Sequence, residues 1–427
     1  MPELPVSPHI RHALKNNAIA LMKWLIFAVL VGLSVGVVGS LFHLALEWAG
    51  EARAAHPWLL FLLPVGGLAI VATYHFAGMD DDSGTEMVIT SIRSGQPMRL
   101  RTAPLIFFAT TITHLFGGSA GREGAALQLG GSISGALGKL LSLDREDERI
   151  ITMCGMAAGF SALFGTPLSA AIFAMEVESV GVMYYAALVP CLLSALLAQK
   201  VAVFFHIYGT LFLVVDVPHL TVDSIISIIL LGILCGILAN LFCRVMGLGG
   251  ALYRRITRNR WLRIVIGGCI VIVFSLLTGT SDYNGAGMEV IRQALAGEAF
   301  PLAFVLKMLL TALTLGAGFK GGEIVPSFFV GATFGCVVAP MLGLSASFGG
   351  AVAMIAVFCG VTNSPMTSIL LGYELFFGGV GIEPMALVAA VSYMTSGYHS
   401  LYHQQKIVYS KTKSNYIDSF SGDEPEE

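Results

Sequence analysis

The chain has few charged residues for its length. Of its 427 residues only 12% are Asp, Glu, Lys or Arg, whereas 56% are hydrophobic. A soluble domain usually has about a quarter charged residues, so this chain lacks the polar groups that would cover a water-exposed surface. We therefore expect lipid to be its solvent, and we exclude a soluble domain.

Three further absences narrow the class. The seven cysteines form no CxxC pair, so they are interpreted as small hydrophobic side chains and not as disulfides or metal ligands. We expect neither a metal nor a cofactor. No ten-residue alternating pattern predicts a β-barrel. The N-terminus has no cleavable signal pattern, so the first apolar run is expected to be a retained helix.

Long apolar runs recur along the sequence. Each has about the twenty residues that a helix needs to cross a bilayer. Examples are Ala18–Leu46, Trp58–Phe76, Tyr185–Phe205, Ile225–Phe242 and Ile264–Leu277. Because lipid-exposed strands cannot satisfy their backbone groups, the predicted fold class is an all-α, multi-pass membrane protein.

Basic and polar segments lie at the borders of these runs. Tyr253–Arg263 contains five arginines, and His9–Lys15 contains two more Lys or Arg residues. Basic loops favour the cytoplasmic side, where we expect both termini. A nucleic-acid-binding patch is the rival interpretation of the arginines, and we expect no such partner. The segment after about Lys406 is polar and is expected to be a short, disordered tail without an appended soluble domain.

The sequence contains an internal repeat. Gly118–Gly135 and Gly318–Gly335 share five identities in eighteen positions at an offset of 200 residues, including the only acidic residue of each stretch. Two more blocks match in the same order: Thr166–Val177 with Ser364–Leu375, and Gly84–Ile89 with Gly285–Ile291. The predicted organisation is a cytoplasmic N-terminal segment (1–16), two membrane half-repeats (17–210 and 220–410) and a polar C-terminal tail (411–427).

Repeats with apolar segments interrupted by Gly and Pro are typical of transporters with broken helices. In such folds the half-helix N-termini bind anions through unpaired N–H groups and the positive end of the helix dipole. The stretch GSAGREG (Gly118–Gly124) has the glycines that let the backbone approach a ligand. Glu123 could occupy the anion site when ionised and leave it when protonated. The pattern predicts a combined gate and proton carrier, and Glu323 is its match in the second half.

The acidic residues also have structural interpretations. Glu123 could pair with Arg122, although adjacent residues on a helix diverge. Glu323 could form an ion pair with Lys320, three residues before it. Glu176 and Glu374 fall late in apolar helices and are interpreted as caps or helix–helix hydrogen bonds.

An enzyme is the alternative from another class. Gly117–Gly121 matches G-x-S-x-G, but that motif needs a strand and a helix of a soluble sheet around it. No aspartate lies within an apolar run, as an intramembrane aspartyl protease would require. His114 is interpreted as a satisfied polar core residue. We therefore expect a transporter and not an enzyme.

The motifs resemble those of one family. GREGAALQLGG (Gly121–Gly131) resembles the G-R-E-G-P-x-x-Q-x-G-G signature of the CLC family of chloride channels and anion/proton antiporters. Segments 157–177, 318–335 and 400–405 are also similar to that family. The resemblance implies an inverted repeat of tilted and partly broken helices. It also implies a homodimer with an anion pathway in each subunit. The expected location is the cell (inner) membrane, and the protein would be of the prokaryotic type.

The resemblance also implies a site. Glu123 would be the external gating glutamate, Tyr402 the central tyrosine, and Ser83–Met87 the counterpart of the central serine motif. Glu323 would be a second carboxylate at the anion. The anion-binding residues would be Ser83, Gly84, Thr85, Gly121, Arg122, Gly124, Gly322, Ile324, Val325 and Tyr402.

Three features favour the fluoride/proton antiporter branch. Val177 stands where chloride/proton antiporters have a second acid, Glu323 lies in a G-x-x-G-G-E-x-x-P pattern, and THLFGGSAGREG is similar to that branch. Fluoride is small and strongly hydrated, so it needs compact donors, and a protonated carboxylate supplies one. Two positions differ from that branch. Thr85 stands where the branch usually has Asn or Met, and Val325 stands where it usually has Thr. They favour the alternative, a chloride-selective antiporter or a passive chloride channel.

Overall fold

The computed structural model describes residues 8–421, with side chains from residue 15 onward. Of the basic segment predicted at His9–Lys15, only the Lys15 side chain falls within this range. Residues 1–7 and 422–427 of the two predicted terminal segments lie outside it.

The described residues form mostly α-helices. Those of the first half are α1 (Pro8–Ala55), α2 (Leu63–Phe76), α3 (Glu86–Ser94), α4 (Thr102–Leu115), α5 (Glu123–Leu140), α6 (Arg145–Phe164), α7 (Pro167–Glu176) and α8 (Leu188–Phe204). Those of the second half are α9 (Val222–Ile256), α10 (Arg260–Thr278), α11 (Met288–Leu295), α12 (Ala303–Ala317), α13 (Ile324–Val338), α14 (Ala346–Thr362), α15 (Pro365–Leu375) and α16 (Ile382–Thr395). The strands are β1 (Ser179–Val180), β2 (Lys406–Tyr409) and β3 (Tyr416–Phe420). The predicted all-α membrane fold is confirmed, with one small sheet added.

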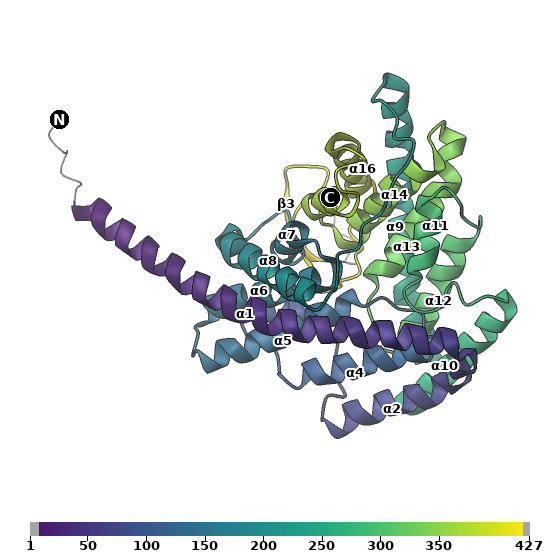
Figure 1. Ribbon diagram of the computed structural model, residues 1–427, viewed down its shortest axis with the longest axis horizontal. Helices are drawn as coiled ribbons and strands as arrows, with labels where there is room; N and C mark the ends of the chain where they lie inside the picture. The colour runs from purple at the N-terminus through teal and green to yellow at the C-terminus, as the bar shows by residue number, and fades with distance from the viewer. Residues whose placement is uncertain (1–7, 422–427) are drawn as a thin grey trace.

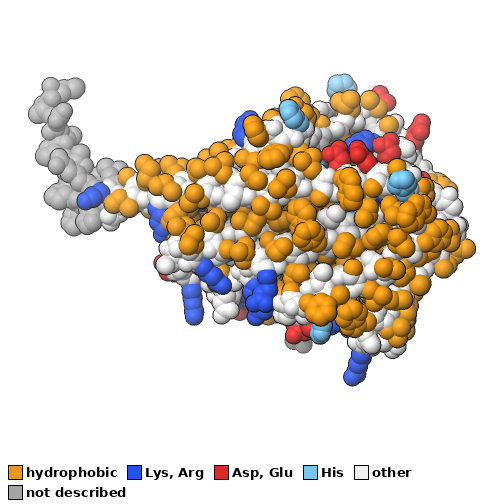
Figure 2. Space-filling model, turned by 60° about the horizontal axis from the view of Figure 1, so that its bottom comes forward, with side chains coloured by type: hydrophobic (Ala, Val, Ile, Leu, Met, Phe, Trp, Pro, Cys, Tyr) orange, Lys and Arg blue, Asp and Glu red, His pale blue; other side chains and the backbone are white. Residues whose placement is uncertain are grey.

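Six helical stretches of the described chain are long and apolar enough to cross a membrane: Lys15–Ala55, Pro57–Phe76, Tyr185–Phe204, Val222–Ile256, Arg260–Thr278 and Ile324–Leu342. The five predicted runs coincide with the first five. Hydrophobic side chains cover most of the face in Figure 2, and charged side chains gather mainly near its borders. This distribution suits a protein that lipid surrounds.

The two halves of the chain occupy different parts of the molecule. Helices α1–α8, purple to teal, lie mainly at the lower left of Figure 1, and most helices of the second half lie at the upper right. Corresponding pairs, α5 with α6 and α13 with α14, make the most extensive contacts between elements. Most residues of α5 and α13 are therefore buried inside the protein, including the N-termini of both helices.

Two glutamates join the halves reciprocally. Glu176, at the end of α7, accepts hydrogen bonds from Met366 N (3.0 Å), Thr367 N (2.8 Å) and the Thr367 hydroxyl (2.6 Å) at the start of α15. Glu374, near the end of α15, accepts the equivalent bonds from residues 168 and 169 at the start of α7. Each carboxylate satisfies N–H groups that a helix start leaves unpaired. The predicted role of both residues as caps is confirmed.

These caps lead to a stability prediction. Glu176→Ala should lower the free energy of unfolding by about 1–3 kcal/mol, since it leaves buried N–H donors unpaired. Glu374→Ala should cost less, because Glu374 is half-buried whereas Glu176 is buried. Thermal unfolding in detergent measures both, with the exposed Glu289→Ala as control. Equal melting temperatures for Glu176→Ala and the control would contradict this role.

The C-terminal segment corrects one expectation. Residues after Lys406 were predicted to form a disordered tail, but β2 pairs antiparallel with β3 and parallel with β1. A hydrogen bond from Lys406 lowers the pKa of the Asp418 carboxyl and links β2 to β3. The polarity that suggested disorder fits β3, which alternates exposed and half-buried residues. The edge strand β1 is two residues long and is the second partner of β2, beside β3.

Candidate functional site

Two loops that precede broken helices pair at the centre of the molecule. Gly121 N donates to Gly322 O (2.7 Å), and Gly322 N donates to Gly121 O (2.8 Å). Helix α5 begins at Glu123 and α13 at Ile324, two residues beyond each glycine. The two helix N-termini therefore lie side by side, and their unpaired N–H groups form a positive environment that suits an anion.

The pairing corrects the repeat alignment by one residue. The offset of 200 matches Glu123 with Glu323, but the bridge joins Gly121 to Gly322 and not to Gly321. Relative to the helix starts, Glu323 therefore takes the position of Arg122, just before its helix. Glu123 is instead the first residue of α5. The two glutamates are neighbours at the site but are not equivalents.

The Glu123 side chain occupies the space between the two N-termini. It is fully buried, and its Oε2 accepts hydrogen bonds from Arg122 N (3.0 Å) and Val325 N (3.2 Å). Its Oε1 has no hydrogen-bond partner among the described residues. One carboxylate oxygen thus takes the place that an anion would take, held by N–H groups from both halves.

The Arg122 side chain differs from the predictions in two ways. It pairs with Glu123, and it does not line the cavity. Its Nε lies 4.0 Å from Glu123 Oε1, so the pair judged unfavourable is formed at the limit of an ion pair. It forms because Arg122 precedes the helix, so the divergence of neighbours on a helix does not apply. The rest of the guanidinium contacts His43 Nδ1 (3.3 Å) and Leu163 O (3.5 Å). Arg122 thus contacts Glu123 through its backbone N–H and its Nε, while the rest of its side chain points away from the cavity.

Glycines let three loops meet. A Cβ on Gly124 would lie 2.6 Å from Thr85 Oγ1, and a Cβ on Gly322 would lie 2.8 Å from Gly124 N and 3.0 Å from Glu123 Oε2. Larger residues would therefore separate the loop before α3 from the starts of α5 and α13. This close approach is the structural reason for glycine in the two motifs.

A cavity of about 480 Å³ leads from these loops to the surface. Seven predicted residues line it: Ser83, Gly84, Thr85, Gly124, Glu323, Ile324 and Tyr402. Of the other predicted residues, Glu123, Gly121, Gly322 and Val325 lie in the buried junction of the two helix starts. The structure therefore brings the predicted residues together, with the Arg122 side chain pointing elsewhere.

Lys320 makes a different ion pair from the one considered. Its Nζ lies 3.7 Å from Asp82 Oδ1 and 4.5 Å from the centre of the Tyr74 ring. Among the described residues it makes no ion pair with Glu323. Asp82 Oδ1 also accepts from Gly84 N (2.6 Å), so the Lys320–Asp82 pair holds the loops of the two halves together. The carboxylate of Glu323 remains available to the cavity.

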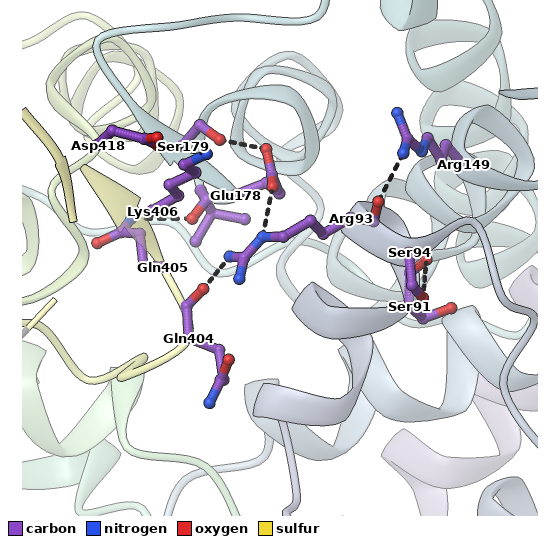
Figure 3. A network of polar contacts seen from close by, with 11 residues as sticks. Ser91, Arg93, Ser94, Arg149, Glu178, Ser179, Gln404, Gln405, Lys406 and Asp418 are labelled. Atoms are coloured by element: carbon purple, nitrogen blue, oxygen red, sulfur yellow. Dashed lines mark hydrogen bonds and ion pairs between the residues drawn. The ribbon is translucent and has the colours of Figure 1, made fainter. Parts of the chain in front are cut away.

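Tyr402 is buried at the wall of the cavity, and its loop is fixed from several sides. Ser400 Oγ donates to Tyr402 O (3.0 Å), and Gln405 Nε2 donates to Val177 O (2.8 Å). Arg93 donates to the Gln404 carbonyl and pairs with Glu178, as Figure 3 shows. These bonds tie the tyrosine loop to α3 and to the end of α7.

Several residues of the site were not predicted. Glu86 and Gln128 line the cavity, and Gln128 Nε2 lies 3.5 Å from Thr85 Oγ1. Arg254, Arg260 and Arg263 also line it, so the predicted arginine cluster stands at its mouth. Glu86 falls within the Ser83–Met87 motif, whose polar residues were the available signal.

His114 makes a contact that suits a polar core residue. His114 is buried with Nε2 3.3 Å from Gly121 O, which confirms a satisfied polar core residue. In the part of the chain that the structure describes, no group of three His, Cys, Asp or Glu side chains could hold a metal ion.

Comparisons with known proteins agree with this architecture. The model of the family described as voltage gated chloride channel matches residues 65–397. The chain is 37% identical over 397 residues to the chloride/fluoride channel protein of Pseudomonas syringae pv. tomato, covering 91% of this chain and 87% of that one. It is 26% identical over 338 residues to the H(+)/Cl(-) exchange transporter ClcA of Vibrio cholerae, covering 73% and 71%.

A solved structure is also similar. The crystal structure of a CLC-type fluoride/proton antiporter superposes with a TM-score of 0.87 and 30% identity, over 91% of this chain and 98% of that one. The family match covers most of the chain, and the solved structure shares its fold. The protein is therefore a multi-pass membrane protein that belongs to the voltage-gated chloride channel, or CLC, family.

Proposed function

We propose that this protein is an anion/proton antiporter that exports fluoride from the cytoplasm in exchange for protons. The observation that carries the proposal is the pair of carboxylates at the joined helix N-termini. Glu123 lies buried in the anion position, and Glu323 lines the adjoining cavity without an ion pair among the described residues. The protein acts as a transporter and not as an enzyme.

The geometry supports exchange. When Glu123 is ionised, its Oε2 takes the N–H groups of Arg122 and Val325. When it is protonated, the carboxyl leaves and an anion accepts the same N–H groups. Proton and anion therefore use one position alternately. Because they move in opposite directions, inward proton movement drives fluoride outward.

Fluoride is favoured over chloride by Glu323. A small, strongly hydrated anion needs a compact donor in place of its water, and a protonated Glu323 facing the cavity supplies one. The similarity to the solved fluoride/proton antiporter supports this choice. Thr85, Gly124 and Ile324 line the same cavity and would surround the ion, with Tyr402 closing the inner side.

The remaining features of the proposal concern assembly and orientation. We place the mouth with Arg254, Arg260 and Arg263 on the cytoplasmic side, as basic residues favour that side. Both termini would be cytoplasmic in an inner membrane. The protein would form a homodimer in lipid, with an anion pathway in each subunit and half-repeats at 17–210 and 220–410.

Efflux from proteoliposomes tests the choice of anion. Vesicles loaded with fluoride or with chloride are compared while external pH is recorded. We expect rapid fluoride release with proton uptake and little chloride release. Equal release of both anions would contradict fluoride selectivity and favour the chloride antiporter or channel, with Thr85 and Val325 setting the selectivity.

A further inference from the structure

We propose that Glu86 carries protons between Glu323 and the cytoplasmic water. This inference rests on the proposed proton exchange and adds a residue to it. The starting observation is that two carboxylates, Glu86 and Glu323, line one cavity together with Tyr402.

Glu86 stands at the junction of two site loops. It is the first residue of α3, directly after Thr85 of the anion loop, and it is half-buried. Its Oε1 accepts a hydrogen bond from His403 N (3.3 Å), one residue beyond Tyr402. The carboxylate thus lies where the anion loop meets the tyrosine loop, on the open side of the site.

The other acids on the cavity are held by cations. Asp82 pairs with Lys320 (3.7 Å), and Asp80 pairs with Arg260 (3.3 Å). Among the described cavity residues, Glu86 and Glu323 are the carboxylates that make no ion pair. An acid without a fixed cation can gain and lose a proton with the least rearrangement.

Glu178 is the competing candidate, because it follows Val177, the position where an inner acid is missing. Figure 3 shows its carboxylate between Arg93 and Ser179. Arg93 Nε lies 3.2 Å from Oε1, and Ser179 donates to Oε2. Glu178 is buried and does not line the cavity. Its hydrogen bonds hold the segment around the tyrosine loop.

The charges around Glu86 suit a proton relay. Glu86 and Glu323 are two acidic side chains on the wall of one cavity. Coulomb repulsion between two carboxylates in one cavity favours a single shared proton. The groups facing them are Lys320, Arg254, Arg260 and Arg263, with His403 beside Glu86.

The proton passes from the Glu323 carboxyl to the Glu86 carboxylate. During fluoride export a proton leaves the Glu323 carboxyl as its O–H bond breaks, and a new O–H bond forms on the Glu86 carboxylate. A direct or single-water hydrogen bond suffices for such a step. Glu86 then releases the proton to water at the cavity mouth. Glu323 returns to its ionised form and can accept the next proton from Glu123.

Glu86→Gln tests the relay in the full-length protein. Glutamine keeps the size and the acceptor for His403 N but cannot carry a proton. We expect coupled fluoride/proton exchange in proteoliposomes to fall about 10²-fold, the lower end of what a positioned proton-transfer group contributes. Fluoride binding, measured by calorimetry in detergent, should stay unchanged, and Glu86→Asp should restore exchange.

The matched control is Glu289→Gln. Glu289 lies in the first turn of α11, the helix of the second half that corresponds to α3, but it is exposed and pairs with Arg292 (3.1 Å). Wild-type exchange in Glu86→Gln would overturn the proposal. Loss of fluoride binding without rescue by Glu86→Asp would also overturn it, since that result indicates a structural role.

Exchange measurements on the wild-type protein distinguish a failure of this proposal from a failure of the fluoride assignment. If it exchanges protons for chloride and not for fluoride, the fluoride assignment fails, and the Glu86 variants are judged on chloride exchange. If it moves no protons with either anion, both proposals fail.

Discussion

Replacing Glu123 with glutamine should abolish proton transport coupled to anion movement. Glutamine keeps an oxygen that can accept from Arg122 N and Val325 N, but it cannot gain or lose a proton. The proton flux should fall at least about 10²-fold, since a required proton-transfer group is removed. Proton uptake by fluoride-loaded proteoliposomes measures the effect.

Two controls distinguish a loss of proton coupling in Glu123→Gln from a folding defect. Glu289→Gln, an exposed acid on α11, should exchange like the wild type. Fluoride binding to Glu123→Gln in detergent shows that the site is intact. Proton-coupled exchange that persists in Glu123→Gln would show that Glu123 is not the proton carrier.

Gly322→Ala should destroy the anion site. The added Cβ would lie 2.8 Å from Gly124 N and 2.9 Å from Glu123 N, and backbone atoms cannot move aside as a flexible side chain would. Overpacking of this kind costs about 1–3 kcal/mol. The methyl group would also separate the two helix N-termini. We expect fluoride binding by calorimetry to be lost and the melting temperature to fall.

A glycine in open space provides the control for this substitution. A Cβ on Gly50, in α1, meets no atom within 4 Å, so Gly50→Ala should bind fluoride normally. Normal fluoride binding by Gly322→Ala would contradict the close approach of the two loops as a requirement for the site.

Much of the fold follows from local sequence signals. The apolar runs predicted the spans, and the place of Glu176 and Glu374 late in apolar helices predicted their role as caps or helix–helix hydrogen bonds. The glycine motifs indicated where α5 and α13 begin. Each of these signals is a pattern of neighbouring residues, which is why the sequence alone suffices for them.

Other features depend on contacts between distant residues. The pairing of Gly121 with Gly322 differs by one residue from the alignment that gives the most identities. Lys320 has Asp82 as its partner, across 238 positions, although Glu323 is close in sequence. Residues 406–421 form ordered strands because β2 pairs with β1, a segment that follows α7 in the chain. Periodicity and spacing carry no information on such pairs.

Glu86 illustrates the limit for the site. In the sequence it is one polar residue of the Ser83–Met87 motif. Its importance comes from the cavity that it shares with Glu323, which only the folded chain forms.

The central claim is coupled exchange, and uphill fluoride movement tests it most directly. Proteoliposomes are prepared with equal fluoride inside and outside, and an inward proton gradient is imposed across the membrane. Fluoride should leave the vesicles against its own gradient and stop when the proton gradient is dissipated. Fluoride that moves only down its gradient, whatever the pH difference, would contradict the account and indicate a passive channel.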